Sequence, residues 1–462
     1  MLTLVSYRVC VRRGAALTNA ESFFWCSALG HDTMRAPRNP AAALAAALLT
    51  LLLASPSARA AAPYVADVTA FGAKGDGVTR DTAAIAAAVA AVAAHGGGVL
   101  LFPTGTYLTA PLNLTSDLEV RLANATLLAV TDWASWPIVA PLPSYGRGRD
   151  FPGPRYGAFL SLNNLTRVRI VGEGGADANF VDGQGEGWWL GKKNGSLTVT
   201  PGHLLETMWS EDVEISDVTF VDSPFWFTHV WSSRRVWVHD MKVRAPRDSP
   251  NTDGIDPDSS SDVLIERIDV INGDDCIAIK SGWDQPGVTY GVPSTNITFR
   301  DNVCDSGNCV AIGSEMSGGV SDVFLSNISC VRGGQLLNVK STLGRGGYIR
   351  NVHLSNSTVV GKVGVALRAA DNYGDNNGPI NSTLVPQIDG IFCSHIRSAP
   401  GAVLGAAGFF EGLGDTPEAG KIVNVVLDDV VLAAAPAGSW RCTNVSGTST
   451  GVSPAPCAAL QG

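Results

Sequence analysis

The stretch from Ser249 to Gly282 reads SPNTDGIDPDSSSDVLIERIDVINGDDCIAIKSG and places an Asn-Thr-Asp-Gly segment and a Gly-Asp-Asp-Cys segment within about one short structural repeat. Between these segments, apolar and polar residues alternate in short runs, which is typical of strands. Asp253 is therefore predicted on one coil of a stack of parallel strands, and Asp274 and Asp275 on the next. Because residues one coil apart are neighbours in such a stack, we expect the three carboxyl groups to lie close together.

Three carboxyl groups at short separation cannot all ionise at the same pH, because each negative charge makes the next ionisation more costly. The group therefore offers a protonated acid beside ionised carboxylates. Hydrolysis of a glycosidic bond requires this division, since one carboxyl protonates the leaving oxygen while another activates water. A single aspartate between strands is more often a turn residue. The spacing of this set, with glycine beside both segments, favours the functional interpretation.

The stretch resembles the polygalacturonases of glycoside hydrolase family 28, which cleave pectin. The family signatures Asn-Thr-Asp and Gly-Asp-Asp are complete here, at 251–253 and 273–275. The resemblance implies that Asp274 is the general acid and that Asp253 and Asp275 activate water in an inverting mechanism. It makes Asn251 a candidate substrate-binding residue. No Cys-X-X-Cys or Cys/His pattern indicates a metal, so neither a metal nor a cofactor is expected.

Two further family signatures are altered. Asn308 stands where the family has the histidine of Gly-His-Gly, and Asn338 stands where it has the arginine of Arg-Ile-Lys. Lys340 keeps the lysine of that second motif, and the resemblance implies that it binds a galacturonate carboxylate. Arg345 is a candidate replacement for the missing arginine, because a guanidinium binds a carboxylate through two parallel hydrogen bonds. Asn308 is retained as a candidate substrate-binding residue.

Two other segments resemble the exo-acting branch of the family. They are the run IGSEMSGG at 312–319 and the Ser-Pro-Phe-Trp sequence at 223–226, which is followed by His229. The tryptophans of the second segment also have a structural interpretation, since Trp usually packs in cores. An exo-acting mode is therefore expected.

The fold class follows from a repeat of short strand-like runs separated by Gly, Asn, Asp or Ser. Examples are RVRIVG from 167, RVWVHDMKV from 235, NITFRDNVC from 296 and DVFLSNISC from 322. The spacing lies in the solenoid range of about 20 to 50 residues. With 45% hydrophobic residues, 16% charged residues and 51 glycines, the pattern predicts an all-β, single-stranded right-handed parallel β-helix over residues 64–430. An Ala-rich helix at 81–94 is expected to cap its first coil, and residues 431–462 are expected to form a loosely ordered tail.

The segment 34–60 has a basic start, an apolar run and a small-residue cleavage site, which together are typical of a secretory signal peptide. Its apolar run is shorter than the roughly 20 residues that span a bilayer, so no membrane association is expected of the mature protein. Residues 1–33 are interpreted as an extra extension. Nine Asn-X-Ser/Thr sequons agree with a secreted, monomeric glycoprotein of the cell wall.

Seven cysteines follow the predicted cleavage site, at 276, 304, 309, 330, 393, 442 and 457. An odd number leaves at least one thiol unpaired if all disulfides are intramolecular. Cys276, within an apolar run, is the candidate for the free buried thiol. Cys442 and Cys457 are expected to close a terminal loop.

The net charge of −9 and pI of about 5.3 argue against a nucleic-acid partner, which needs a basic surface. A pectic polysaccharide is itself anionic, so its binding site would need locally gathered Lys and Arg. Three alternatives remain: a calcium-dependent pectate lyase, a wall-binding protein that has lost catalysis, and a hydrolase of rhamnogalacturonan or xylogalacturonan. The complete set of three aspartates favours a hydrolase over a binding protein, and the match to the hydrolase motifs favours it over a lyase. The changes at Asn308 and Asn338 leave rhamnogalacturonan and xylogalacturonan open as substrates beside homogalacturonan.

Overall fold

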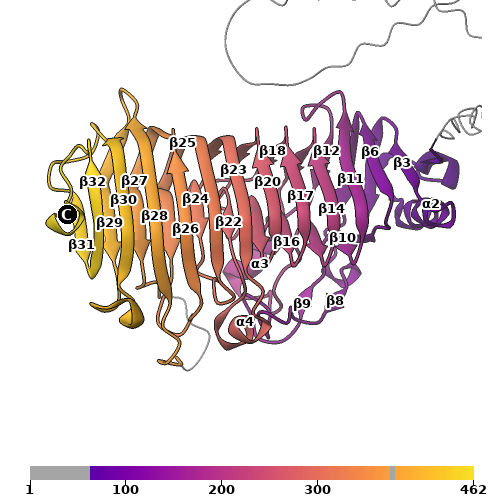
Figure 1. The fold of residues 1–462 in the computed structure, drawn as a ribbon. Coiled ribbons are helices and arrows are strands. Elements are labelled where there is room, and N and C mark those ends of the chain that lie inside the picture. The colour runs from indigo at the N-terminus through magenta and orange to yellow at the C-terminus, as the bar shows by residue number, and fades with distance from the viewer. Residues whose placement is uncertain (1–62, 375–379, 462) are drawn as a thin grey trace, which may run out of the picture. The chain divides into compact units, whose positions relative to one another are not determined.

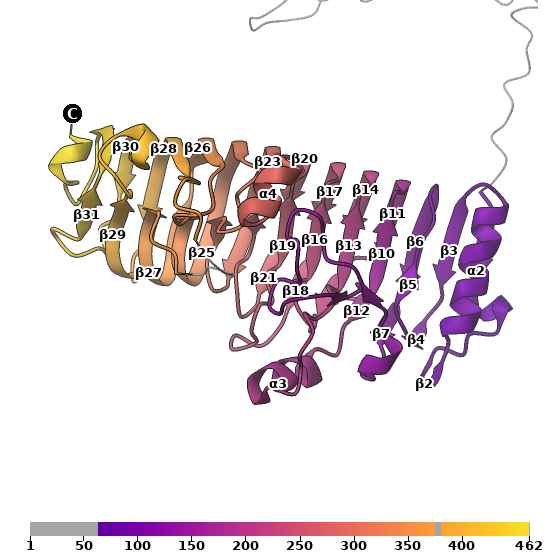
Figure 2. The same cartoon turned by 90° about the horizontal axis from the view of Figure 1, so that it is seen from below.

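The computed structural model describes residues 63–374 and 380–461. Within them, parallel strands stack coil upon coil into a single β-helix, which Figure 1 shows from the side and Figure 2 from below. The prediction of a parallel β-helix is confirmed. The predicted extension 1–33 and signal peptide 34–60 lie outside the described residues.

Each coil contributes strands to three ladders, and the long strands bend across corners and join more than one of them. The first ladder consists of β1 (Val65–Asp67), β3 (Gly98–Phe102), β6 (Leu118–Ala123), β11 (Thr166–Glu173), β14 (Glu211–Ser216), β17 (Arg234–His239), β20 (Ser261–Glu266), β23 (Ser294–Asp305), β25 (Val320–Lys340), β26 (Tyr348–Ser355), β28 (Gln387–Ser398), β30 (Ile422–Val431) and β32 (Val445–Thr450). The second ladder consists of β2 (Asp76–Arg80), β4 (Gly105–Thr109), β7 (Ala125–Ala129), β12 (Phe180–Asp182), β15 (Thr219–Val221), β18 (Lys242–Arg244) and β21 (Asp269–Ile271), and then of parts of β23, β25 and β27 (Thr358–Ala370).

The third ladder carries the site described below, and its outward surface is here called the cleft face. It consists of β5 (Leu112–Asn113), β10 (Leu160–Asn163), β13 (Leu205–Met208), β16 (Thr228–Trp231), β19 (Ile255–Asp258), β22 (Ala278–Ile279) and β24 (Val310–Ile312), and then of the ends of β25 and β27, β29 (Val403–Glu411) and β31 (Trp440–Thr443).

The interior of the coil is filled by columns of apolar side chains, because the same inward position recurs in every coil. One column on the first ladder consists of aliphatic and aromatic residues and one cysteine, Cys393, and all of its members are almost completely buried. In register, these are Ile170, Ile215, Val238, Ile265, Phe299, Leu325, Leu354, Cys393 and Leu427. Cys393 is the one free cysteine of the described residues, and burial raises the pKa of its thiol to about 12. It therefore serves as a small apolar side chain.

The Asn- and Asp-rich turns of the sequence are explained by two columns of left-handed residues. In successive coils, one residue near the start of the first-ladder strand and one at its end have φ near +55°, a conformation that Asn and Asp tolerate better than most residues. The second of these columns contains Asp217, Asp240, Arg267, Asp301, Asn327, Asn356, His395 and Asp429. These residues allow the chain to turn sharply at the same place in each coil.

The two ends of the stack are covered differently. Helix α2 (Thr82–Ala94) lies across the first coil, with Ile85, Val89 and Val92 buried, so the predicted capping helix is confirmed. At the other end, the expectation of a loosely ordered tail is wrong, because β31 and β32 add two strands to the ladders. Their pairing is supported by Trp440, which is 7% exposed, and by the 3-10 turn η4 (Ala458–Leu460).

Three disulfides lie in the described residues: Cys276–Cys304, Cys309–Cys330 and Cys442–Cys457. The predicted terminal bridge is confirmed. The prediction of a free thiol at Cys276 is wrong, because its neighbour on the next coil is Cys304, and Cys393 is the unpaired one. Sequence spacing could not reveal which cysteines share a register across coils.

Several segments leave the β-helix on the side of the cleft face, as Figures 1 and 2 show. They are the antiparallel pair β8 (Ile138–Val139) and β9 (Arg155–Tyr156), helix α3 (Glu186–Asn194) and helix α4 (Asp284–Tyr290). Short 3-10 turns also occur, at η1 (Val68–Phe71), η2 (Trp133–Ser135) and η3 (Pro417–Ala419). No helix among the described residues is both long and apolar enough to span a membrane.

Candidate active site

The cleft face presents two parallel rows of polar side chains, because alternate residues of each strand point outward. The first row, read along the stack, consists of Glu206, His229, Asp256, Asn338 and Arg368. The second row consists of Trp231, Asp258, Lys280 and Lys340. Charged residues at strand positions that would otherwise be apolar indicate a functional surface.

The three aspartates enter this face from the turns that precede its strands. Asp253 lies just before β19, and Asp274 and Asp275 lie just before β22. One carboxylate oxygen from each lies within 4.8 Å of the others, so the structure brings together the three groups that the spacing predicted. Asp253 and Asp275 are buried, whereas Asp274 is only half-buried. Asp274 is therefore the member of the set that a ligand in the cleft can reach.

Burial and mutual repulsion raise the affinity of these groups for protons. Burial, together with the charges of Asp274 and Asp256, raises the pKa of Asp253 well above its usual value. Burial and the Asp275 charge likewise raise the pKa of Asp274. Asp253 and Asp274 therefore bind a proton more tightly than an isolated aspartate does, which is the property required of a general acid.

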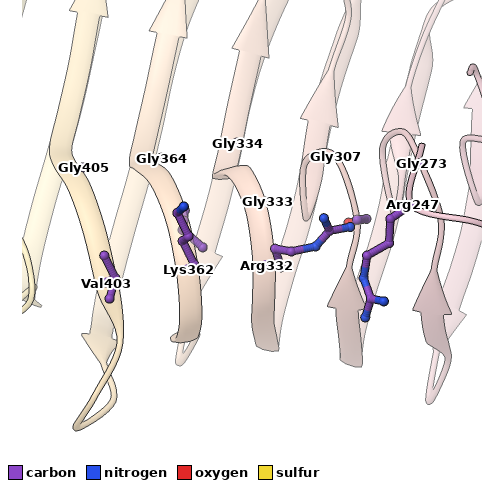
Figure 3. Close-up of a pocket in the computed structure, with 12 residues that line it drawn as sticks. Arg247, Gly273, Gly307, Arg332, Gly333, Gly334, Lys362, Gly364, Val403 and Gly405 are labelled. Atoms are coloured by element: carbon purple, nitrogen blue, oxygen red, sulfur yellow. The ribbon is translucent and has the colours of Figure 1, made fainter. Parts of the chain in front are cut away.

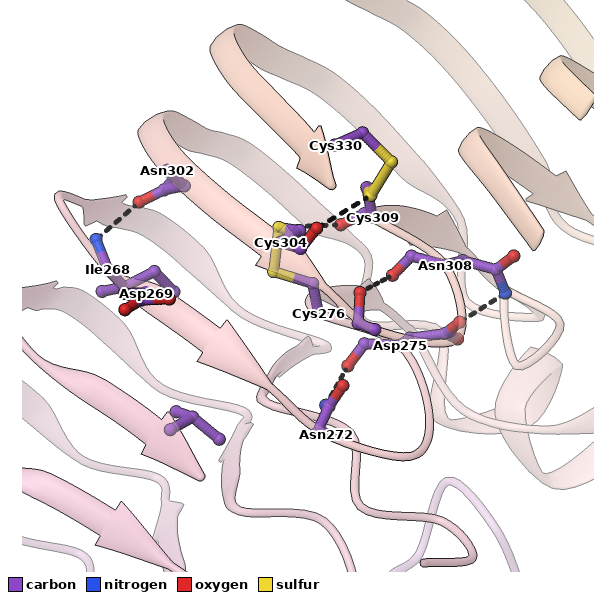
Figure 4. Close-up of a disulfide and its surroundings, with 12 residues drawn as sticks. Ile268, Asp269, Asn272, Asp275, Cys276, Asn302, Cys304, Asn308, Cys309 and Cys330 are labelled. Carbon is purple, nitrogen blue, oxygen red and sulfur yellow. Dashed lines mark hydrogen bonds between the residues drawn. A yellow bond between two sulfur atoms is a disulfide. The ribbon is translucent and has the colours of Figure 1, made fainter. Parts of the chain in front are cut away.

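Asp275 is held in place by donors on both of its oxygens. The ammonium group of Lys340 lies 2.8 Å from Oδ2, and the side-chain amide of Asn308 donates to Oδ1 at 2.5 Å. Figure 4 shows the contact between Asn308 and Asp275, together with Asn272, whose amide donates to the backbone carbonyl of Asp275 at 2.9 Å. These donors hold the carboxyl group of Asp275 in one orientation.

Two disulfides fix the backbone around this carboxylate. Cys276 follows Asp275 directly and is bridged to Cys304, while Cys309 follows Asn308 and is bridged to Cys330 (Figure 4). The backbone amide of Cys276 also donates to the carbonyl of Asn308 at 2.8 Å. The donor and acceptor of the Asn308–Asp275 bond are therefore carried by chain segments that are tied to neighbouring coils.

Lys280 is a buried cation that the sequence analysis did not identify. Its ammonium group lies 3.4 Å from Asp253, 3.6 Å from Asp256 and 3.8 Å from Glu315, and 4.1 Å from the centre of the Trp226 ring. Burial raises the pKa of Asp256 to about 7 despite this cation. Strand alternation was the available signal, since Asp256 and Lys280 fall on outward positions of strands that are otherwise apolar.

Arg345 occupies a different place from the one expected of a substrate-binding residue. Its side chain is completely buried, donates to the carbonyl of Ser314 at 2.8 Å, pairs with Asp284, and lies over the Trp283 ring. Because the guanidinium is enclosed by protein, it supports the loop that carries Glu315 and does not face the cleft.

The arginine nearest to the missing Arg-Ile-Lys position is Arg368, which the sequence analysis also missed. It lies on the next coil in register with Asn338 and donates to the Asn338 side-chain oxygen at 3.0 Å. Its other hydrogen bond goes to Asn372, at 2.9 Å. A half-buried guanidinium bonded to two neutral amides remains available to an anionic ligand.

Asn251 lies at the edge of the site, two residues before Asp253. Its side-chain oxygen accepts a hydrogen bond from Lys192 of helix α3, and Lys192 also pairs with Asp150. The structure therefore connects Asn251 to the segments that cover the cleft face. Its contact with a substrate stays a prediction.

One half of the cleft face is covered by a buried polar network. Arg155 donates to Glu206 at 2.9 Å, the two imidazole nitrogens of His229 contact Glu206 and Asp258 at 3.0 and 3.2 Å, and Tyr145 donates to Asp258 at 2.6 Å. Burial alone would lower the pKa of His229, but its two acidic neighbours raise it above the usual value. The chain around Tyr145 and Arg155 thus seals the N-terminal half of the face.

Comparison with known proteins agrees with this geometry. The family described as Glycosyl hydrolases family 28 matches residues 102–454, and a family described as Rhamnogalacturonase A/epimerase, pectate lyase-like matches residues 65–119. A probable polygalacturonase from Vitis vinifera is 37% identical over 404 residues, which cover 86% of this chain and 80% of the relative. An exopolygalacturonase from Zea mays is 30% identical over 256 residues, about half of each chain.

Solved structures show the same fold. An exopolygalacturonase from Thermotoga maritima superposes with a TM-score of 0.71 at 23% identity, covering 84% of this chain and 92% of that one. A family 28 exopolygalacturonase from Yersinia enterocolitica gives a TM-score of 0.67 at 18% identity, covering 85% and 75%. The right-handed parallel β-helix expected from the sequence is thereby confirmed. With its family match over most of the described β-helix, the chain belongs to glycosyl hydrolase family 28 and is a pectin-hydrolysing glycoside hydrolase of the polygalacturonase type.

Proposed function

We propose that Asp274 protonates the glycosidic oxygen of a galacturonan chain while Asp275, aided by Asp253, activates the attacking water. The observation that carries this assignment is the approach of three carboxylate oxygens to within 4.8 Å. Asp274 is the most exposed of the three and has a raised pKa, as suits a proton donor. Asp275 is bound by Lys340 and Asn308, as suits a base that must be held in a fixed orientation.

The proposed stereochemistry is inversion at the anomeric carbon. Inverting enzymes with two catalytic carboxyl groups usually hold them about 6.5–9.5 Å apart to admit a water molecule. The oxygens here are closer, but three carboxyl groups share the task. Two of them, Asp253 and Asp275, are available to hold the water while Asp274 acts as the acid.

An exo-acting mode is supported by the closed half of the cleft face. Glu206, His229, Trp231 and Asp258 point outward from the ladder yet are at most 1% exposed. Tyr145 binds Asp258, and the hydroxyl of Ser144 accepts a hydrogen bond from the Trp231 indole at 2.9 Å. A chain end could enter as far as this wall, whereas the interior of a long polymer could not pass it.

Lys340 and Arg368 are the proposed partners of the substrate carboxylates. Both lie on the open side of Asp275, one coil apart on the cleft face. These cations supply the local positive charge that a polyanionic substrate needs on a protein of net charge −9.

A secreted, glycosylated monomer is the proposed form of the protein. Eight of the nine sequon asparagines are exposed in the described residues, and the ninth, Asn444, is half-buried. The exposed ones are Asn113, Asn124, Asn164, Asn194, Asn296, Asn327, Asn356 and Asn381. Mass determination before and after removal of N-glycans from secreted protein tests this proposal.

The assignment of catalytic roles is tested by product analysis on de-esterified polygalacturonate. Wild-type protein is expected to release saturated galacturonic acid from chain ends, and Asp274→Asn to lose activity by about 10²–10⁴-fold. The matched control, Asp415→Asn, changes an exposed carboxylate far along the chain and should leave the rate unchanged. Early proton NMR spectra of the released sugar report the anomer, and retention would contradict the proposed mechanism.

Two further outcomes would redirect the assignment. Unsaturated products that disappear with a chelator would indicate a calcium-dependent lyase, in which the same three carboxylates hold the cation. Binding without hydrolysis would indicate a wall-binding protein. Hydrolysis of rhamnogalacturonan or xylogalacturonan in preference to polygalacturonate would keep the chemistry and change the substrate.

A further inference from the structure

A groove of about 500 Å³ runs beside the active site along one edge of the cleft face. It lies where the chain turns into the strands of the cleft face, and it crosses successive coils toward the C-terminal end. Figure 3 shows its glycines side by side on neighbouring coils. In chain order they are Gly273, Gly307, Gly333, Gly334, Gly364 and Gly405.

The floor of the groove is bare backbone because the coils pack too closely here for side chains. A Cβ atom on Gly364 would lie 2.8 Å from the carbonyl oxygen of Gly334, and one on Gly405 would lie 2.6 Å from that of Gly364. Both distances are below normal van der Waals contact. Close stacking of the coils therefore requires glycine at these positions. Because glycine has no side chain, the row of glycines forms a shallow channel.

The walls of the groove are basic. Arg247, Arg332 and Lys362 line it, and the two arginines share one carboxylate, Asp305. Lys362 is exposed and has no hydrogen-bond or ion-pair partner among the residues that the structure describes. The three basic side chains carry three positive charges, and Asp305 offsets one of them. The groove is therefore positively charged, although the protein has a net charge of −9.

The groove begins beside the catalytic aspartates, at Gly273, which directly precedes Asp274. The backbone amide of Gly307 donates to the carbonyl oxygen of Asp274 at 2.6 Å. From there the groove passes over coils that lie on the opposite side of Asp274 from the wall around Tyr145. Neighbouring coils are about 4.8 Å apart, so the span from Gly273 to Gly405, four coils further on, is about 19 Å.

We propose that this groove binds the trailing part of a galacturonan chain, several sugar residues away from the bond that is cleaved. The inference rests on the proposed function for the identity of the polymer. Anionic sugar residues would lie along the backbone floor, with their carboxylates toward Lys362 and the two arginines. The groove then raises affinity for long chains and leaves the binding of short oligomers unchanged.

The test compares long and short ligands in protein that also carries Asp274→Asn, so that binding is measured without turnover. Lys362→Glu reverses the charge of the unpaired cation, and Val403→Glu adds a negative charge at the far end, where Val403 is 57% exposed. The matched control is Lys74→Glu, an exposed lysine near the first coil. Calorimetry measures the affinity for polygalacturonate and for trigalacturonate at two salt concentrations.

Each groove variant is expected to weaken polygalacturonate binding by about 3- to 10-fold, as the loss of one surface charge interaction would. The variants should bind trigalacturonate like the parent protein and should show a weaker dependence on salt. Equal loss for both ligands, or no loss for the polymer, would overturn the proposal. The binding measurement needs no catalysis, so it tests the groove separately from the proposed function. Failure of the wild-type protein to hydrolyse polygalacturonate would refute the proposed function, and the binding data would still decide whether the groove holds the polymer.

Discussion

The ammonium group of Lys340 lies 2.8 Å from the Oδ2 atom of Asp275, and the two side chains are 9% and 1% exposed. Burial alone would lower the pKa of the lysine, but Asp275 and its other acidic neighbours raise it, so the lysine stays charged. Asn308 engages the other oxygen of Asp275. Both carboxylate oxygens of the proposed base are therefore engaged by side chains of the protein, one by a cation and one by a neutral amide.

Replacing Lys340 by Met removes the positive charge nearest to the carboxyl group of Asp275, the proposed base. Since a base works only when deprotonated, the acidic limb of the kcat/KM profile should move to higher pH, by about one unit or more. Lys340→Arg keeps the charge and is the matched control. A pH profile of the Met variant that fell uniformly, with an unmoved acidic limb, would assign Lys340 to substrate binding alone.

Replacing Asn308 tests whether its amide orients Asp275. Asn308→Ala removes a neutral donor that lies 2.5 Å from Asp275. A lost hydrogen bond costs about 1 kcal/mol, so kcat should fall by about 5- to 10-fold. Asn308→Asp puts a carboxyl group in the same place and should cost much more at neutral pH than at acid pH, where the new group is protonated. If both variants lost the same activity at every pH, the amide would have only a packing role.

The sequence predicted those parts of the site that depend on local spacing. Asp253, Asp274 and Asp275 precede strands one coil apart, and the coil itself is readable from short alternating runs. Lys280 and Arg368 were not found, because their relation to the aspartates depends on register across coils. Register across coils also decides that Cys276 pairs with Cys304, which the sequence analysis did not predict. Likewise, β31 and β32 are ordered because they pair with strands of the preceding coils.

Arg368 should supply the guanidinium that the altered Arg-Ile-Lys motif lacks. Arg368→Met is expected to raise KM for polygalacturonate by about 10-fold or more, since one charged hydrogen bond contributes about 1.5–3 kcal/mol, while kcat changes less. The sharper test is relocation, in which Asn338→Arg is added to Arg368→Met. Because the two positions are in register, the double variant should recover part of the lost affinity.

The matched control for Arg368 is Arg350→Met, which removes an exposed guanidinium that is bonded to Gln387 on the first ladder. Its kinetics should equal those of wild type. If Arg368→Met lowered thermal stability but left KM unchanged, the residue would be a structural link between Asn338 and Asn372.

Asp371 is a buried carboxyl group that the proposed mechanism does not use. It follows strand β27, is 1% exposed, and neither of its side-chain oxygens has a hydrogen-bond partner among the described residues. Burial raises its pKa to about 8. An unfolded chain would release this proton near the usual value of about 3.9, so the folded state binds one more proton across the interval between these two values.

The contribution of Asp371 to stability therefore falls as pH rises from about 4 to about 8, because this group binds fewer protons there in the unfolded state than in the folded state. Asp371→Asn imitates the protonated carboxyl group and removes this dependence. Its Tm should equal that of wild type near pH 4 and exceed it by a few degrees at pH 7, as measured by calorimetry, while Asp415→Asn shows no such divergence. A Tm difference between Asp371→Asn and wild type that stayed constant at all pH values would contradict this prediction. It would mean that Asp371 releases its proton at the same pH in the folded and the unfolded protein.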